Sequence, residues 1–427
     1  PIRDAVESLV EMRRLLPLVE LVLDGRVWPV LDDRLKTVAE IVVEEGRALE
    51  PELPERRVRL DPLLRVVPVA GYDEVVRRLR SLAERAAGIR LHDGCRLERT
   101  LVALGRDPAR ESAKPGYRLE PNMRSDDAMK SIHRVLLDTM QRNEGGIRAD
   151  IDSEFLHDFR VAVRRTRSGL AQVPDVFPRA VVSGYRERFA WLGERTGPLR
   201  DLDVHRLTLR QVRRELPEEL RHALDPFEAE LGRRRAEEHG RLVHVLDSAR
   251  YAQLVERWRG FLNKPSPRRT SLGNAMRPIR AVAGERILEA WRKVIKRGHA
   301  IEPDSPARRL HRLRISCKKL RYLLEFFAEL YPEAELARVI RPLKKLQNNL
   351  GEFNDLAVQR REVLDWRGAA QAAAPTADET EAAAALLLDR IDRDSRRTRA
   401  QFDERFAAFE TARIGTLFAR LFGERAG

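Results

Sequence analysis

The chain has 427 residues, which is enough for two or three domains that each bury a sizeable core. Lys and Arg number 81 and Asp and Glu number 67, so the formal net charge is +14. Residues 1–120 contain 22 residues of each sign, and the whole positive excess therefore belongs to the remainder. This distribution excludes a strongly acidic protein and predicts that a polyanionic partner would bind after residue 120.

The cysteine content and the hydropathy pattern exclude several further classes. Cys95 and Cys317 have no partners at metal-ligand spacing, which argues against a zinc site and favours a reducing cytosol. No run approaches the roughly 18 apolar residues of a membrane-spanning helix, and the N-terminus lacks a basic start followed by an apolar stretch. We therefore expect a cytoplasmic protein with no membrane partner.

Residues 1–112 predict a small α+β domain built on an antiparallel sheet. Short runs rich in Val, Leu and Ile are separated by turn signals such as Asp24-Gly25 and Glu45-Gly46. These predicted strands are 16–23, 27–31, 36–43 and 63–69. Apolar residues then recur at helical spacing over 72–87, and a second helix is predicted around 95–104.

Residues 113–124 contain Pro and Gly and predict a linker before a helical region. Ser125 is the predicted N-cap of a helix that Gly145-Gly146 would end. Lys130 and Arg134 lie four residues apart on that helix. They would either extend an anion site or form a solvent-facing pair.

The helical region contains an internal repeat. His157–Pro178 occurs a second time as His311–Pro332, displaced by 154 residues without a gap. At about 100° per residue, His157, Arg160, Arg164 and Arg167 fall within an arc of roughly 80°, and His311, Arg314, Lys318 and Arg321 match them. Each copy therefore presents one basic stripe.

Both stripes border an apolar face rather than lying opposite one. The adjoining apolar residues are Leu156, Phe159, Val163 and Leu170 in the first copy and Leu310, Leu313, Cys317 and Leu324 in the second. Neither stripe contains an acid, so its cations would repel one another unless an anion lay among them. Two facing stripes therefore predict an anion-binding groove. The alternative is a pair of ordinary basic surface helices.

The repeat continues downstream of the stripes. After a predicted helix over 179–195, GPLRDLDV at 197–204 matches GEFNDLAV at 351–358, which aligns Asp201 with Asp355. We favour a structural role for these Gly and Asp residues as a helix stop and a helix cap. Alternatively, each carboxylate orients an Arg or the His of the basic helix. Lys344 and Lys345 add positive charge to the second half, with no basic counterparts in the first.

These motifs resemble the CHAD domain, a family named for histidines on α-helices. The resemblance rests on HxxRVxxRRxR at 157–167, HxLRIxxKKLRY at 311–322 and LGEFNDLAV at 350–358, and it covers about 125–425. It implies a mainly α fold of two pseudo-symmetric four-helix bundles, at 125–263 and 279–427 with a linker at 264–278, and a basic channel that binds inorganic polyphosphate. The predicted phosphate-binding residues are His157, Arg160, Arg164, Arg165, Arg167, His311, Arg314, Lys318, Lys319, Arg321, Lys344, Lys345, Lys130 and Arg134.

The N-terminal region resembles part of a second family. RVRLDPLLRVVPVAGYDEVVRRL at 58–79 is similar to the later half of a CYTH, or triphosphate tunnel, domain. Residues 1–50 lack the ExExK signature with which that family binds metal and phosphate. We therefore assign no catalytic residue, metal site or cofactor. Glu40, Glu44 and Glu45 would be either remnants of a metal cluster or, as we favour, exposed strand-end charges.

Three functions compete at this point. The first, which we favour, is non-catalytic binding of inorganic polyphosphate, with localisation in the cytoplasm or at polyphosphate granules. The second is nucleic-acid binding, although the stripes carry no interleaved aromatic residue except Tyr322. The third is triphosphate hydrolysis by the N-terminal region. The sequence does not indicate an oligomeric state.

Overall fold

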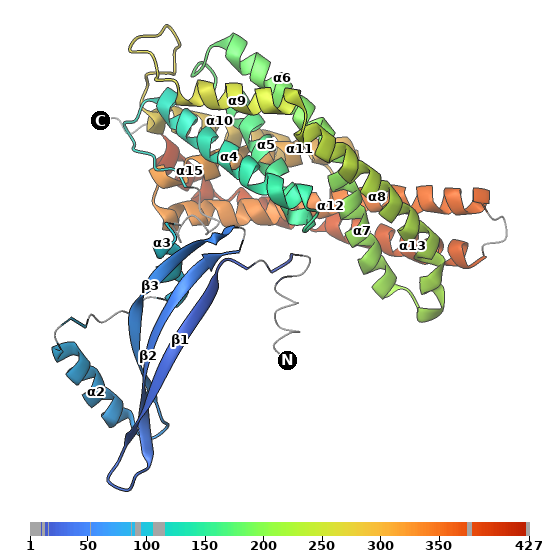
Figure 1. The fold of residues 1–427 in the computed structure, drawn as a ribbon. Helices are drawn as coiled ribbons and strands as arrows, with labels where there is room; N and C mark the ends of the chain where they lie inside the picture. The colour runs from blue at the N-terminus through green and yellow to red at the C-terminus, as the bar shows by residue number, and fades with distance from the viewer. Residues whose placement is uncertain are drawn as a thin grey trace. The chain divides into compact units, whose positions relative to one another are not determined.

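The computed structural model describes residues 10, 13–15, 17–51, 53–86, 88–89, 95–105, 116–373 and 378–423. The chain forms two compact units whose main boundary lies between Gly116 and Tyr117 (Figure 1). The first contains a three-stranded sheet and the second is mainly helical, so the predicted fold class is confirmed. Within the described residues, no helix combines the length and the apolar character that a bilayer span requires.

The first unit is an antiparallel sheet with two helices. Strands β1 (Glu20–Leu31), β2 (Thr37–Glu50) and β3 (Leu53–Pro68) pair in the order β1-β2-β3. Helices α2 (Asp73–Arg85) and α3 (Arg96–Ala103) follow, close to their predicted positions. Glu44, which we considered as a remnant of a metal cluster, forms ion pairs with Arg65 at 2.7 Å and with Arg96.

Two predicted turns in this unit are wrong. Asp24 and Gly25 lie inside β1, where they pair with Glu45 and Glu44 of β2, and Gly46 continues β2. A Cβ at Gly46 would come within 2.5 Å of the Leu23 side chain and 2.7 Å of a backbone oxygen of β1. The ladder is also irregular between Glu44 and Gly46. Gly46 therefore serves close strand packing at a bulge rather than a chain reversal.

The helical unit has two halves related by the sequence repeat. The first half comprises α4 (Ser125–Arg148), α5 (Ser153–Gln172), α6 (Arg179–Arg195), α7 (Gly197–Glu215), the 3-10 helix η1 (Glu218–Leu224), α8 (Asp225–Leu246) and α9 (Ala249–Asn263). The second comprises α10 (Ile279–His299), α11 (Ala307–Phe326), η2 (Ala328–Leu330), α12 (Glu333–Ala373), α13 (Asp378–Ala400), α14 (Phe402–Phe409) and α15 (Ala412–Phe422). Helices α4, α5 and α6 begin 154 residues before α10, α11 and α12.

A symmetric backbone contact joins the two halves just before their opening helices. Arg124 and Pro278, which are equivalent in the repeat, form an isolated antiparallel bridge. Ser125 N donates to Arg277 O at 3.0 Å, and Ile279 N donates to Met123 O at 2.8 Å. The hydroxyl of Ser125 also donates to Arg277 O, so Ser125 does not provide the predicted side-chain N-cap. These equivalent bonds place a local pseudo-twofold axis at this bridge.

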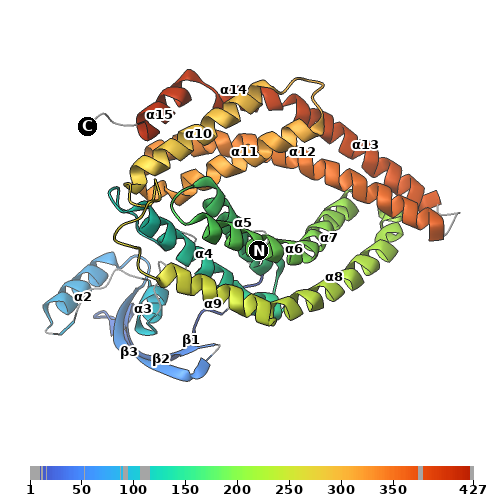
Figure 2. The same ribbon diagram turned by 90° about the horizontal axis from the view of Figure 1, so that it is seen from above.

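One apolar core runs through both halves. Most of its residues come from α4, α5, α6 and α9 of the first half and from α10, α11, α12, α14 and α15 of the second. Helix α5 packs directly against α11 near the middle of the unit (Figure 2). A second, smaller core lies where the remaining helices of the two halves meet, between α7, α8, α12 and α13. Its largest member is Trp366, which packs near Phe227. Apolar packing therefore fixes the two halves at two separate places.

A histidine lies inside the main core. His133 of α4 is fully buried, packs edge-on against Trp258 with ring centroids 5.4 Å apart, and lies beside Gly169 of α5. Neither ring nitrogen has a hydrogen-bond partner among the residues that the structure describes. Burial lowers the pKa of His133 to about 3, because the core disfavours the charged imidazolium. The equivalent position of the second half is Ile287, which is also fully buried.

Replacing His133 by Ile should flatten the acid side of the stability profile. The unfolded chain binds a proton near pH 6.5, whereas the folded chain keeps the imidazole neutral until the pH approaches about 3. The contribution of His133 to the free energy of unfolding is therefore complete above pH 6.5 and is lost as the pH falls toward 3. Relative to His133→Ile, the unsubstituted protein should lose about 1.4 kcal/mol of unfolding free energy per pH unit in this window. Urea denaturation across the window measures this slope, and identical slopes would contradict the prediction.

Candidate functional site

The two basic stripes lie on helices that pack against each other. Their apolar neighbours enter the core as predicted: Phe159 and Leu313 are fully buried, as are the adjoining positions of α5 and α11. The charged side chains at the edge of this packing are thereby brought together from both copies. We call Arg160, Arg164, Arg314, Lys318 and Arg321 the basic cluster.

Electrostatic coupling between the helices shows how close the two copies come. Burial, together with repulsion from Arg314, Arg164 and Arg321, lowers the pKa of Lys318 to about 8, although Asp355 acts in the opposite direction. Arg164 belongs to α5, while Lys318 belongs to α11. The like charges of the two stripes therefore act on one another across the helix interface.

Arg160 is held by the first half itself. Its guanidinium donates to Gly193 O at 2.9 Å and to Thr196 Oγ1 at 2.8 Å, both at the C-terminal end of α6. Burial and the neighbouring Arg164 lower the pKa of Arg160, while Asp201 raises it. These bonds fix the side chain in place and occupy part of its donor capacity.

Acids next to the stripes neutralise part of the cluster. Glu325, one turn beyond the second stripe, pairs with Arg165 of α5 and with Arg321 at 2.6 Å. Asp355 of α12 lies 3.9 Å from Arg314. Arg164 and Lys318, in contrast, form no ion pair within the described part of the chain. The two stripes contain no acids, as the sequence shows, but the fold supplies acids from positions outside them.

The two histidines differ in their surroundings. His157 is half-buried, and its pKa is lowered by burial and by Arg200 of α7, which keeps the imidazole neutral at pH 7. His311 is exposed, and its Nδ1 lies 3.1 Å from Asn354 Oδ1 of α12. Each histidine is the fifth residue of its helix. The histidines therefore offer hydrogen-bonding groups at the cluster's edge rather than a matched pair of charges.

Sequence reasoning missed Arg200. It lies close to His157 and Arg160, and it donates to Ser153 O at 3.2 Å at the start of α5. Its repeat equivalent is Asn354, the residue beside His311. The aligned segments at 197–204 and 351–358 already carried this signal, because both place a polar residue immediately before the matched Asp.

A second set of cations adjoins the cluster at Lys319. Burial lowers the pKa of Lys319, and so does repulsion from Lys293 and Arg297 of α10 and from Arg186 of α6. Arg186 belongs to the first half and the other three to the second. The sequence pattern does not indicate Arg186, Lys293 or Arg297, because their approach to Lys319 depends on how the halves pack. Positive charge therefore extends from the cluster along the junction of the two halves.

Within the part of the chain that the structure describes, no ion pair involves the three remaining predicted residues, Arg167, Lys344 and Lys345. The Arg167 guanidinium lies beside Gly193 of α6. Lys344 and Lys345 are exposed on α12. At about 100° per residue, Lys344 lies roughly 60° from Gln347, which accepts a 3.3 Å bond from Arg321, whereas Lys345 lies roughly 160° away on the outer face. Lys344 is thus better placed than Lys345 to extend the cluster.

Lys130 and Arg134 are not part of the cluster, so their predicted placement in the anion site is wrong. Lys130 is buried and donates to Lys264 O at 2.6 Å and to Ser266 Oγ at 3.1 Å. Arg134 donates to Leu262 O at 2.5 Å and to Asn263 Oδ1 at 3.2 Å. Both cations satisfy acceptors at the C-terminus of α9, where positive charge is favourable.

The predicted helix-cap role of Asp201 and Asp355 is also wrong. Asp201 lies inside α7, and Asp355 lies inside α12, which continues through Gly351 without a break. Asp355 instead faces Arg314 at 3.9 Å, and Asp201 raises the pKa of Arg160. The alternative interpretation, in which each carboxylate accompanies an Arg of the basic helix, agrees with this geometry.

Comparison with known proteins places these features in a family. The family model described as CHAD domain matches residues 131–364, a stretch of more than half of the chain that includes both stripes. The chain belongs to the CHAD domain family.

A solved CHAD domain agrees with this assignment at the level of the fold. The crystal structure of the CHAD domain from the plant Ricinus communis is 25% identical; the match covers 74% of this chain and 99% of that one, with a TM-score of 0.51. PptA from Streptomyces chartreusis is 16% identical, with coverages of 66% and 99% and a TM-score of 0.49. The comparison with curated proteins finds no match.

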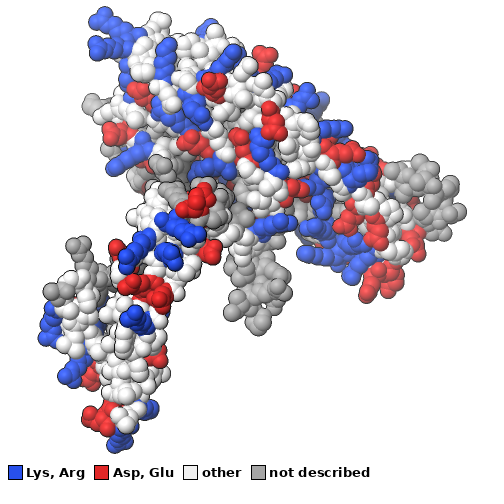
Figure 3. Space-filling view, viewed as in Figure 1, with Lys and Arg blue, Asp and Glu red and all other residues white. Residues whose placement is uncertain are grey.

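The outer surface of the CHAD domain has mixed charge on the face shown in Figure 3. Lys and Arg side chains are interspersed there with Asp and Glu, notably around α7 and α8. Among the described residues, no three His, Cys, Asp or Glu side chains are grouped so that they could hold a metal ion. The Arg and Lys side chains of the basic cluster are of the type that donates charge-assisted hydrogen bonds to anions.

Replacing Glu325 by Gln should destabilise the CHAD domain in low salt. Arg165 and Arg321 would lose their shared carboxylate, and these partly exposed pairs together contribute about 1–2 kcal/mol. Added phosphate should reduce the loss by supplying an anion and by screening the repulsion. Thermal unfolding with and without phosphate measures both effects. Glu352→Gln, an exposed carboxylate without an ion pair in the described part of α12, is the control, and equal shifts in the two variants would contradict the assignment.

Proposed function

We propose that the CHAD domain binds inorganic polyphosphate at the basic cluster, without catalysing a reaction. The observation that carries this proposal is the approach of Arg164 and Lys318 from the two copies, because neither has a carboxylate partner in the described part of the chain. An unpaired, half-buried Lys beside three Arg residues is unfavourable on its own. A polyanion lying along the helix junction would supply the missing negative charge.

The chemistry of these side chains suits a chain of phosphate groups. Arg offers a planar fork to two oxygens, and Lys offers a mobile point charge. Basic residues three or four apart on a helix are separated by about 5 Å along its axis, which roughly suits successive phosphates in an extended polymer. Lys319, Lys293, Arg297 and Arg186 continue the positive charge past the cluster. The resemblance of the two stripes to the CHAD domain implies the same function, binding of polyphosphate.

Nucleic acid is a weaker candidate for the same site. Sequence-tolerant binding of single strands relies on aromatic side chains that stack with bases. Tyr322, the aromatic residue of the second stripe, has Arg165 over its ring at 5.9 Å. The face of Tyr322 toward α5 is therefore already occupied. This packing favours recognition of phosphate groups over recognition of bases.

The sheet unit enters the proposal as a non-catalytic part of the chain. A triphosphate hydrolase of the CYTH type would need carboxylates free to hold a metal ion. Glu44 is committed to Arg65 and Arg96, and Glu45 lies 3.4 Å from Arg59. This pairing supports a structural role for both acids. A metal-dependent release of phosphate from tripolyphosphate would overturn this part of the proposal.

Arg164→Ala combined with Lys318→Ala should weaken binding of long-chain polyphosphate at least tenfold. The variant removes two cations that face the proposed ligand, so the slope of log affinity against log salt should fall by roughly 1 to 2. Filter binding across a salt series measures both quantities. Arg268→Ala with Arg269→Ala removes the same charge from an exposed linker and should bind like the parent protein. Equal loss in both variants, with circular dichroism unchanged, would refute the site.

Affinity for polyphosphate should fall as the pH rises through about 8. The pKa of Lys318 is about 8 in the free protein, and a bound polyanion would raise it, so binding above this pH requires uptake of a proton. The expected loss is up to about tenfold per pH unit. Lys318→Arg copies the equivalent residue Arg164 and should keep the affinity constant over the same range. A parent protein and variant with the same pH profile would show that Lys318 does not contact the ligand.

A further inference from the structure

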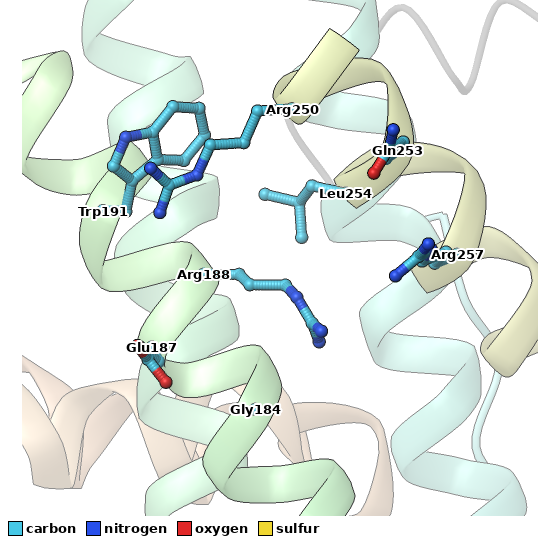
Figure 4. Close-up of a pocket in the computed structure, with 8 residues that line it drawn as sticks. All are labelled: Gly184, Glu187, Arg188, Trp191, Arg250, Gln253, Leu254 and Arg257. Atoms are coloured by element: carbon cyan, nitrogen blue, oxygen red, sulfur yellow. The ribbon is translucent and has the colours of Figure 1, made fainter.

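A pocket outside the basic cluster gathers three arginines between α6 and α9. It has a volume of about 250 Å³ and is lined by Gly184, Glu187, Arg188, Trp191, Arg250, Gln253, Leu254 and Arg257. Figure 4 shows Arg188 extending from α6 toward α9 and Arg257 on the facing helix. Among the described residues, none of the three guanidinium groups forms an ion pair with a carboxylate. Arginines gathered without acid partners point to an anionic ligand.

Local contacts hold these guanidinium groups at the pocket. Arg250 lies over the Trp191 ring at 4.2 Å, and Arg188 lies over the Tyr185 ring at 5.3 Å. Burial raises the pKa of the Tyr185 hydroxyl, while the nearby charges of Arg188 and Arg257 both lower it. Arg188 and Arg257 therefore approach the same ring from different helices. Such stacking reduces the conformational entropy that each Arg loses when it binds a ligand.

Gly184 makes room for this arrangement. A Cβ at this position would lie 3.3 Å from Arg188 Nη1, which is closer than ordinary van der Waals contact. A side chain at position 184 would require the Arg188 guanidinium to shift by a few tenths of an ångström. Glycine is otherwise unfavourable in the middle of a helix, by roughly 1 kcal/mol relative to alanine. The absence of a side chain at position 184 therefore leaves room for the Arg188 guanidinium in its observed position.

The pocket and the basic cluster lie on different faces of α6. At about 100° per residue, Gly184, Arg188 and Trp191 share one face of the helix. Arg186, which adjoins the cluster, and Gly193, whose carbonyl binds Arg160, lie roughly 180° around the helix from Gly184. A ligand in the pocket therefore does not occupy the polyphosphate path proposed above.

We propose that this pocket binds a terminal pyrophosphoryl group, the chemistry shared by inorganic pyrophosphate and nucleoside diphosphates. A phosphate group offers three strong acceptor oxygens in different directions, which suits guanidinium forks from two helices, whereas a carboxylate offers two oxygens in one plane. The pocket is smaller than the roughly 300–1,000 Å³ that encloses a drug-sized ligand, so the remainder of a nucleotide would stay outside it. The inference does not depend on the basic cluster binding polyphosphate.

Titration calorimetry of the full chain tests the pocket. Every protein in this experiment also carries Arg164→Ala and Lys318→Ala, so that binding at the basic cluster is weakened. Pyrophosphate should bind at one site, and Arg188→Ala with Arg257→Ala should weaken it at least tenfold. Both arginines are exposed, so the core should stay intact. Arg179→Ala with Arg259→Ala removes the same charge from exposed positions that do not line the pocket and should leave affinity unchanged. Gly184→Ala should weaken binding without loss of charge.

The outcomes separate the ligand sources and the two proposed sites. Binding of pyrophosphate together with ADP supports a nucleotide source, whereas binding of pyrophosphate alone supports an inorganic one. Absence of binding by both, or equal weakening in the pocket and control variants, overturns the pocket. Retention of long-chain polyphosphate by the parent chain is measured separately. A failure of the cluster and a failure of the pocket are therefore distinguishable.

Discussion

The CHAD domain depends on apolar packing that holds like charges next to each other. Two unit charges 4 Å apart repel by about 1 kcal/mol in water and by about 4 kcal/mol near a protein surface. Full burial of a Leu or Phe contributes about 1.5–3 kcal/mol, and each basic helix buries several such residues, including Phe159 and Leu313. The core therefore outweighs the repulsion between α5 and α11. Without a core shared by both halves, the stripes would separate.

This packing explains why the fold supplies counterions selectively. Glu325 and Asp355 neutralise Arg165, Arg321 and part of the charge near Arg314, while Arg164 and Lys318 stay unpaired within the described residues. Complete neutralisation would stabilise the free protein and remove the attraction for an anion. Complete absence of acids would oppose the approach of the helices. The observed balance leaves the uncompensated charge at the contact between the two copies.

The local architecture was largely predictable, because it is encoded at helical spacing and repeated. The stripe positions, their apolar neighbours and the offset of 154 place α5 and α11 correctly. The errors occurred where a tertiary contact overrides a local signal. Gly46 resembles a turn residue, but the absence of a side chain there allows β1 to approach β2 closely. Lys130 has the spacing of a groove residue, but the end of α9 attracts it. No periodicity in one sequence reveals such partners.

The two copies differ in charge at equivalent positions of their basic helices. Glu325 occupies the position equivalent to Ala171, yet it pairs with Arg165 of the first copy. The carboxylate that one helix lacks is therefore supplied by its counterpart across the interface. Arg164 is likewise matched by Lys318, whose pKa of about 8 lies much closer to neutral pH than that of any arginine. The backbone symmetry brings equivalent positions together, and the Arg-to-Lys difference at this position gives the second stripe a side chain that can lose its charge near pH 8.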